Sequence, residues 1–168
     1  MKKYIAFIIA AFTVLFFVLV YIVASNNKAM LTSADFTETP LIIVDAGHGG
    51  MDGGAVGADG SVEKEYNLQI AQKVNSMLSF LGYNTVMTRT GDISLHDSQA
   101  TTIRQQKVSD IHNRMKVIEQ NNNSIFVSIH QNHYSDASQK GMQVFFSNNN
   151  PLSKELAQNI QDTVVKEI

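Results

Sequence analysis

The 168-residue sequence contains no cysteine, so neither disulfide bonds nor thiolate metal sites can form. Any metal ion would therefore have to be held by histidine, aspartate or glutamate. Charged residues are also scarce: they make up 17% of the chain, the net charge is −2, and no long basic run occurs. A nucleic-acid-binding face needs clustered lysine and arginine, so the composition argues against a nucleic-acid partner.

The N-terminus carries the longest apolar run. Three residues with two lysines precede 21 uncharged residues, Tyr4–Ala24, about the length that spans the hydrocarbon core of a membrane. A cleaved signal peptide, with small residues at 23–25, is the alternative, but its apolar region is usually only about 7–15 residues long. Residues 1–24 are therefore predicted to be a membrane anchor or signal segment. The lysines place the N-terminus inside and the rest outside, and an extracytoplasmic domain suits a chain without cysteine.

Polar, aperiodic residues at 25–40 are predicted to form a linker, and the domain that follows, 41–168, opens on a strand and a glycine-rich loop. The four apolar residues 41–44 predict a buried strand, and the six glycines in 47–57 indicate that the backbone turns sharply after it. These glycines lack the lysine of a P-loop and the spacing of a dinucleotide fold. His48 thus lies at the carboxyl end of a strand, where open α/β sheets bind their ligands.

Helical and strand patterns alternate through the rest of the domain. Apolar stripes with steps of three and four predict helices whose stripes face the core, at 67–81, 108–118 and 151–168. Further apolar runs predict strands at 83–89, 125–129 and 141–146, and Gly82 is predicted to end the first helix in a left-handed cap. This alternation predicts an α/β fold, a mostly parallel twisted sheet with helices on both faces. The last helical pattern has no returning strand, so we expect the sheet to be incomplete at the C-terminus.

Three potential metal ligands lie at the ends of these elements: His48, Glu63 and His130. Right-handed crossovers bring successive strand ends to one edge of a sheet, so the three could converge there. Two histidines and one carboxylate leave a fourth tetrahedral position open, the pattern of catalytic zinc, and imidazole favours zinc over magnesium or calcium. Taken singly, a histidine at a strand end is more often a hydrogen-bonding loop residue, and a glutamate at a helix start complements the helix dipole. On spacing alone, Glu65 and His133 remain competing ligands.

Four segments occur in a characteristic order: DAGHGG (45–50), GSVEKEYNLQIA (60–71), FVSIHQN (126–132) and GMQVFF (141–146). Together they resemble the zinc-dependent N-acetylmuramoyl-L-alanine amidases of the amidase-3 group, and IRQQKVSDIHNRMKVIE (103–119) is most similar to the sporulation-specific, CwlD-type members. The resemblance implies that His48, Glu63 and His130 ligate one zinc ion, and it favours Glu63 over Glu65. It also implies hydrolysis of the amide between N-acetylmuramic acid and L-alanine in spore-cortex peptidoglycan, a step toward muramic-δ-lactam.

The family pattern also contains a glutamate on a later strand, in a motif resembling VEIGFLSN, which serves as general base and proton donor. Nothing after Ser147 resembles this motif, so no catalytic residue is identifiable and the general-base glutamate is expected beyond Ile168. Because a placed proton-transfer group is typically worth about 10²–10⁴ in rate, we expect the 168-residue form to hydrolyse poorly or not at all. We interpret the sequence as the N-terminal portion of a longer amidase. The alternative is an inactive relic that binds zinc or the cell wall.

The resemblance also implies partners and a location. The substrate would be the glycan-peptide of peptidoglycan, and the N-terminal apolar segment would hold the protein at a membrane, in a sporulating cell the space between the forespore membranes. A zinc pocket lined so heavily by glycine favours a protein partner that stabilises it. The order of the motifs argues against a different zinc hydrolase, such as a deacetylase.

Overall fold

The computed structural model describes residues 16, 18, 39–132 and 141–167. The predicted anchor or signal segment and the linker therefore lie outside the described residues, apart from Phe16, Val18 and the last two linker positions. Within the described part of the chain, no helix is both long enough and apolar enough to cross a membrane. The predicted α/β domain at 41–168 is described over most of its length.

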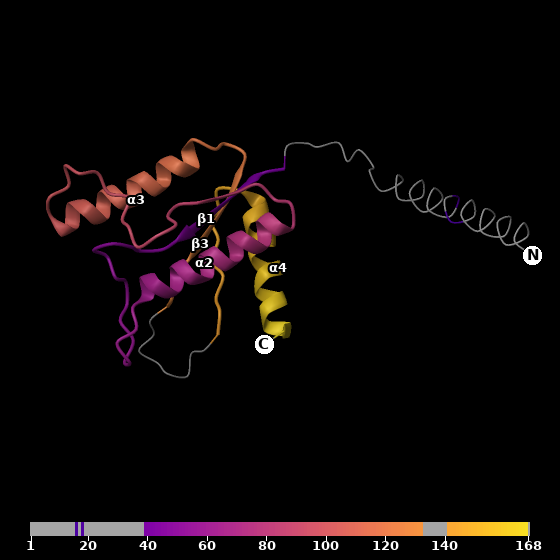
Figure 1. The fold of residues 1–168 in the computed structure, drawn as a ribbon, viewed down its shortest axis with the longest axis horizontal. Coiled ribbons are helices and arrows are strands. Elements are labelled where there is room, and N and C mark those ends of the chain that lie inside the picture. The colour runs from indigo at the N-terminus through magenta and orange to yellow at the C-terminus, as the bar shows by residue number, and fades with distance from the viewer. Residues whose placement is uncertain (1–15, 17, 19–38, 133–140, 168) are drawn as a thin grey trace, which may run out of the picture.

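Three parallel strands form a single sheet in the order β2-β1-β3 (Figure 1). The strands are β1 (Leu41–Ala46), β2 (Thr85–Met87) and β3 (Ser124–Ile129). Ile43 of β1 lies in register between Val86 of β2 and Phe126 of β3. A central parallel strand is buried on both faces, which explains the unbroken apolar run at the start of β1.

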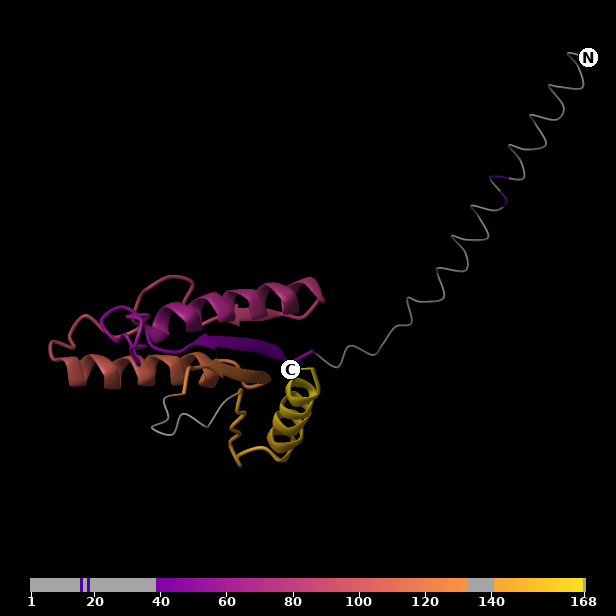
Figure 2. The ribbon, with the colours of Figure 1, turned by 90° about the horizontal axis from the view of Figure 1, so that it is seen from below.

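Helices lie on both sides of this sheet, with α2 on one side and α3 and α4 on the other (Figure 2). The helices are α2 (Glu63–Phe80), α3 (Ile103–Glu119) and α4 (Pro151–Glu167). The apolar core lies between β1 and α2, where Val44 and Ala46 meet Ala71. Leu68 and Val74 of the apolar stripe predicted for α2 pack against this cluster. The predicted α/β fold, with a parallel sheet and helices on both faces, is confirmed.

The connection from α2 to β2 follows the sequence pattern closely. Gly82 has a φ of +90° directly after the C-cap residue Leu81, so the predicted left-handed end of the helix is confirmed. The strand predicted over 83–89 is shorter, Thr85–Met87. Arg89 lies beyond its end, and the guanidinium bonds to backbone carbonyls at the end of β1.

The apolar stripe predicted for α3 is not buried. Val108, Ile111 and Met115 are 46%, 59% and 46% exposed, so the expectation that they face the core is wrong. The buried residue of α3 is instead Arg114, whose guanidinium pairs with the carboxylate of Asp45 in β1. A polar contact with the sheet, rather than apolar packing, therefore determines which face of α3 is turned toward β1.

The strand predicted over 141–146 is also wrong, because the segment is irregular. The side chain of Gln161 in α4 holds it: the N–H of Val144 donates to Oε1 of Gln161, and Nε2 of Gln161 donates to the carbonyl of Met142, both at 3.0 Å. One glutamine side chain thus takes backbone partners that a neighbouring strand supplies in a sheet. In the stripe predicted for α4, Leu152 and Leu156 are exposed and Ile160 and Val164 are half-buried, and the buried residue of α4 is Ala157.

Candidate metal centre

His48 lies just after the end of β1 and has an unusual backbone conformation. Its φ is +62°, and among the described residues it is the one non-glycine residue with a positive φ, a conformation uncommon outside glycine. Two buried arginines hold the chain here. Arg89 donates to the carbonyls of Ala46 and Gly47 at 2.8 and 3.0 Å. Arg114 donates to the carbonyl of His48 at 2.8 Å, so the turn is held firmly enough to keep its strained residue in place.

The guanidinium of Arg114 is itself fixed by a buried carboxylate. Asp45 is 3% exposed and pairs with Arg114, and its two oxygens also accept hydrogen bonds from Thr88 Oγ1 and Ser128 Oγ, both at 2.6 Å. Nε of Arg114 donates to Asp110 at 2.7 Å. Buried charges need such full pairing, because a lone one is strongly destabilising. The network therefore links α3, β2 and β3 to the strand end that presents His48.

Glu63 is the first residue of α2, and the glycine-rich loop serves in place of a helix cap. Val62 precedes the helix and makes no side-chain cap. The N–H of Glu63 donates to the carbonyl of Ala55 at 2.9 Å, and the N–H of Lys64 donates to that of Gly53 at 3.0 Å. The first N–H groups of a helix have no partners within the helix, so these bonds tie the loop to α2. As a result the side chain of Glu63 is enclosed beside the loop that carries His48.

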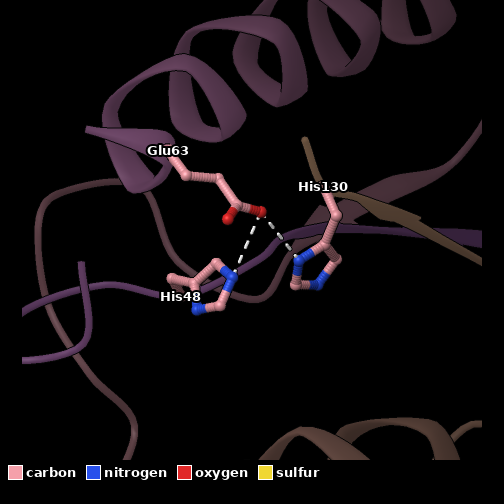
Figure 3. A group of neighbouring side chains, drawn as sticks. All are labelled: His48, Glu63 and His130. Atoms are coloured by element: carbon pink, nitrogen blue, oxygen red, sulfur yellow. Dashed lines mark hydrogen bonds and ion pairs between the residues drawn. The ribbon is translucent and has the colours of Figure 1, made fainter. Parts of the chain in front are cut away.

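His130 directly follows β3, and its imidazole meets the other two side chains (Figure 3). Nε2 of His48 and Nδ1 of His130 each lie 3.1 Å from Oε1 of Glu63. The two ring centroids are 4.8 Å apart, with ring planes at 80°. One ligand atom from each of the three residues lies within 4.8 Å of the other two. The structure thus brings together the three residues selected from the sequence, in a group that could hold a metal ion.

The distances from the two imidazole nitrogens to Glu63 are close to those found around a small tetrahedral ion. Two atoms each about 2.0–2.1 Å from a tetrahedral zinc ion lie about 3.3 Å apart, close to the 3.1 Å from each imidazole nitrogen to Glu63. Imidazole and carboxylate donors suit zinc better than magnesium or calcium. The side chain of His130 is 47% exposed, which leaves one side of the group open to solvent. An open position is typical of catalytic rather than structural zinc sites.

The carboxyl group of Glu63 is held in its ionised form. Burial acts to raise its pKa, but hydrogen bonds from the N–H groups of Ala55 and Gln131 and from the side chain of Asn67 outweigh burial. The pKa of Glu63 is therefore about 2, below its ordinary value of 4.5. The charge of His48 acts in the same direction. A carboxylate that stays charged at neutral pH is ready to ligate a cation without first releasing a proton.

Two polar residues beside the group were missed by the sequence reasoning. Asn67, fully buried, donates to Oε1 of Glu63 and to the carbonyl of Gly47, both at 3.2 Å. Asp52 accepts from Nδ1 of His48 at 2.9 Å. The spacing held a signal for Asn67, because a residue four positions after Glu63 lies on the same face of the helix. Asp52 follows His48 by the same interval in a loop, where spacing predicts nothing.

Two glycines allow the ligands to approach the loop closely. A Cβ added at Gly47 would lie 2.7 Å from Nδ1 of His130 and closer still to Nε2 and Cε1 of the same ring. A Cβ at Gly54 would lie 2.6 Å from Oε2 of Glu63 and 2.6 Å from Cδ2 of His48. The space that side chains would occupy at these positions is therefore filled by the three candidate ligands themselves.

Of the two competing ligands, only Glu65 lies among the described residues, and it does not join the group. Glu65 is exposed on the first turn of α2, and His133 lies outside the described residues. His96 bonds to Ser94 Oγ at 2.8 Å through Nδ1. His112 lines a shallow groove of about 930 Å³ along α3, and no residue lining this groove belongs to the metal group.

Fold and cluster together define a class: a parallel α/β domain with a candidate metal centre at the carboxyl edge of its sheet. The chain matches the family described as N-acetylmuramoyl-L-alanine amidase (Amidase_3) over residues 42–168. The chain belongs to this amidase family. The resemblance noted in the sequence is therefore confirmed.

Individual relatives agree with this assignment. The germination-specific N-acetylmuramoyl-L-alanine amidase of Bacillus subtilis (strain 168) is 30% identical over 160 residues, covering 95% of this chain and 66% of the relative. The structure of the CwlD amidase from Clostridioides difficile, solved in complex with the GerS lipoprotein, is 36% identical with a TM-score of 0.72, covering 76% of this chain and 66% of that one. AmiC2 of Nostoc punctiforme is 28% identical with a TM-score of 0.62, covering 77% and 63%. The chain spans just under two thirds of the length of these relatives.

Proposed function

We propose that the protein contributes the zinc site of an N-acetylmuramoyl-L-alanine amidase, which hydrolyses the amide between N-acetylmuramic acid and L-alanine in spore-cortex peptidoglycan, toward muramic-δ-lactam. The observation that carries the proposal is the convergence of His48, Glu63 and His130 in a domain of this family. The germination-specific relative and the CwlD structure support the cortex as the site of action.

In this proposal the three side chains are the zinc ligands, and one zinc ion is bound. When bound, zinc polarises the scissile carbonyl and acidifies water at neutral pH. Glu63 supplies negative charge without proton release, and Asn67 holds its Oε1 in place. His130, which is half exposed, lies at the open side of the site where a bulky glycan-peptide would arrive. Gly47 and Gly54 keep side chains out of the space behind the ligands.

The test uses the full-length amidase of which 41–168 is proposed to be the N-terminal portion of the catalytic domain, purified in mild detergent, loaded with zinc and incubated with isolated cortex peptidoglycan. The proposal expects zinc-dependent release of new alanine N-termini, lost in His48→Ala. The matched control is His96→Ala, which removes a histidine outside the metal group. Alanine release by His48→Ala at the wild-type rate, with zinc still bound, would contradict the proposal.

A second candidate is zinc or cell-wall binding without hydrolysis. The observation in its favour is that Glu63 and Asp52, the two carboxylates in contact with the site histidines, both have a pKa of about 2. Efficient general bases have a pKa near the working pH, so neither carboxylate suits that role. Tight zinc binding and sedimentation with peptidoglycan, without any alanine release, would select this candidate. Alanine release by the full chain would exclude it.

The remaining parts of the proposal concern location and partners. We propose that residues 1–24 form an anchor or signal segment, 25–40 a linker and 41–168 the N-terminal portion of the catalytic domain, with the domain outside the cytoplasmic membrane. The CwlD amidase of Clostridioides difficile was solved in complex with a lipoprotein, and this supports a protein partner here as well. The proposal of a partner is tested by measuring zinc affinity with and without extracts of the cell envelope. If a partner stabilises the site, zinc should bind more tightly when the extract is present.

A further inference from the structure

The two nitrogens of the His48 ring face different carboxylates. Nε2 lies 3.1 Å from Oε1 of Glu63, within the metal group, and Nδ1 lies 2.9 Å from Oδ2 of Asp52. Figure 3 shows one ring nitrogen directed at Glu63 and the other directed away from it. Asp52 is therefore on the far side of the ring from the candidate metal position. Its carboxylate contacts the ring and is not itself one of the grouped ligands.

A tight turn places Asp52 there. The N–H of Gly49 donates to the carbonyl of Asp52 at 2.9 Å, and the N–H of Asp52 donates back to the carbonyl of Gly49 at 3.1 Å. Gly49 and Gly50 have φ values of +135° and +56°, which glycine adopts without a steric penalty. The pair of bonds folds the chain back on itself, so that the side chain four residues after His48 returns beside its ring.

A cation from a distant helix fixes the second oxygen of this carboxylate. Nζ of Lys107, in α3, lies 2.9 Å from Oδ1 of Asp52. With Oδ1 paired to Lys107, the carboxylate has Oδ2 available for His48. The side chain of Asp52 is 24% exposed and that of Lys107 is 50% exposed, so the lysine contact is accessible to solvent while the histidine contact is more sheltered.

We propose that Asp52 is a positioning residue: it accepts a hydrogen bond from Nδ1–H of His48, which fixes the ring orientation and leaves Nε2 as the metal-binding nitrogen, and Lys107 orients Asp52. Histidines that bind metal usually donate their other ring N–H to such an acceptor, which sets the tautomer and strengthens the ligand. If the only role of Asp52 were its surface ion pair with Lys107, replacing Asp52 would leave the zinc affinity unchanged. This inference rests on the proposed zinc site.

The test compares Asp52→Ala and Asp52→Asn with wild type in the full chain, with zinc affinity measured by competition with a chromophoric chelator. We expect Asp52→Ala to bind zinc about 10–100-fold more weakly, the range found when such partners are removed. Asp52→Asn keeps an acceptor oxygen, so we expect a smaller loss. Lys107→Met should lose at most about fivefold, as is typical of partly exposed ion pairs. The matched control is Asp59→Asn, which removes a charge from the same loop at a side chain that accepts a hydrogen bond from the N–H of Ser61 and does not contact His48.

A second readout separates positioning from a general loss of structure. In spectra of the zinc-loaded protein with ¹⁵N-labelled histidine, wild-type His48 should show a protonated Nδ1 and a metal-bound Nε2. Asp52→Ala should shift the Nδ1 signal while the circular dichroism stays that of wild type. Wild-type zinc affinity and unchanged His48 signals in both Asp52 variants would overturn the inference. Zinc binding with the expected Asp52 effects, but without peptidoglycan hydrolysis by the full-length amidase, would support the inference and count against the proposed hydrolysis alone.

Discussion

Replacement of Gly47 by alanine should damage the metal centre while leaving the fold intact. Gly47 has no positive φ, so alanine is compatible with its backbone, and Gly→Ala at such a position tends to stabilise a protein by about 0.4–1 kcal/mol through the unfolded chain. The new methyl group, however, would lie 2.7 Å from Nδ1 of His130. Ordinary contact begins at 3.4 Å, so this nitrogen must retreat by at least about 0.7 Å, and the two ring atoms that lie closer must retreat further.

That displacement is large on the scale of a metal site. Ligand distances in well-formed sites vary by about 0.2 Å, so His130 would no longer reach an ion held by the other two residues. The half-exposed ring can swing into solvent rather than disturb the core. Removing a partner that only supports a ligand costs about 10–100-fold in metal affinity. Displacing a ligand itself should therefore cost at least about 100-fold.

Zinc competition and thermal unfolding of the full chain test this expectation. Gly91→Ala is the matched control, because a Cβ at Gly91 has no other atom within 4 Å. A double variant, Gly47→Ala with His130→Ala, shows whether the methyl group acts through the ring, since coupled residues give non-additive effects. We expect the double variant to bind zinc as His130→Ala does. Wild-type affinity in Gly47→Ala, or a further large loss in the double variant, would contradict a displacement of His130 by the methyl group.

Two predictions concern stability. Arg114→Met should lower the free energy of unfolding, measured in urea, by about 3–5 kcal/mol, because it leaves the buried charge of Asp45 without its cation. Adding Asp45→Asn should restore part of this loss, whereas Arg104→Met, at an exposed residue, should change the stability little. Equal stability of the Arg114 variant and the wild type would contradict the role of the pair. The metal-free protein should lose stability as the pH falls from about 5 to 2. The pKa of Glu63 is about 2 in the folded protein and 4.5 in the unfolded chain, so between these values the unfolded chain binds a proton that the folded protein does not. This difference corresponds to about 3 kcal/mol, and Glu63→Gln should flatten the pH dependence; an equally steep profile in that variant would show that other groups cause it.

The sequence predicted the elements whose evidence is local. The run 41–44 gave a buried strand and the stripe of α2 a helix packed on it, and both are found. Gly82 ends α2 as expected. The same periodicity was wrong for α3, where the apolar stripe is exposed and Arg114 is buried. Periodicity shows that a segment is helical, but which face is buried depends on what the opposite surface offers, here the carboxylate of Asp45.

The candidate site divides in the same way. Residue type and position at the ends of elements pointed to His48, Glu63 and His130 but left Glu65 and His133 open. The family resemblance favoured Glu63 over Glu65, and the role of the three residues as zinc ligands stays a prediction. Asn67 and Asp52, which lie beside them, contact the candidate ligands through their side chains, and the sequence motifs did not indicate these contacts. The strand predicted at 141–146 failed for a related reason, because its backbone groups bond to a glutamine side chain from α4.

The class of fold, the family and, through the family resemblance, the three candidate ligands were predictable from the sequence, because strand patterns, helix patterns and motifs each occupy residues close together along the chain. The contacts of Glu63 with His130 across 67 positions and of Asp45 with Arg114 across 69 are seen in the folded structure alone. Such contacts depend on the path that the chain takes between the two residues. That path, and not the residues next to a side chain in the sequence, determines the partner of the side chain.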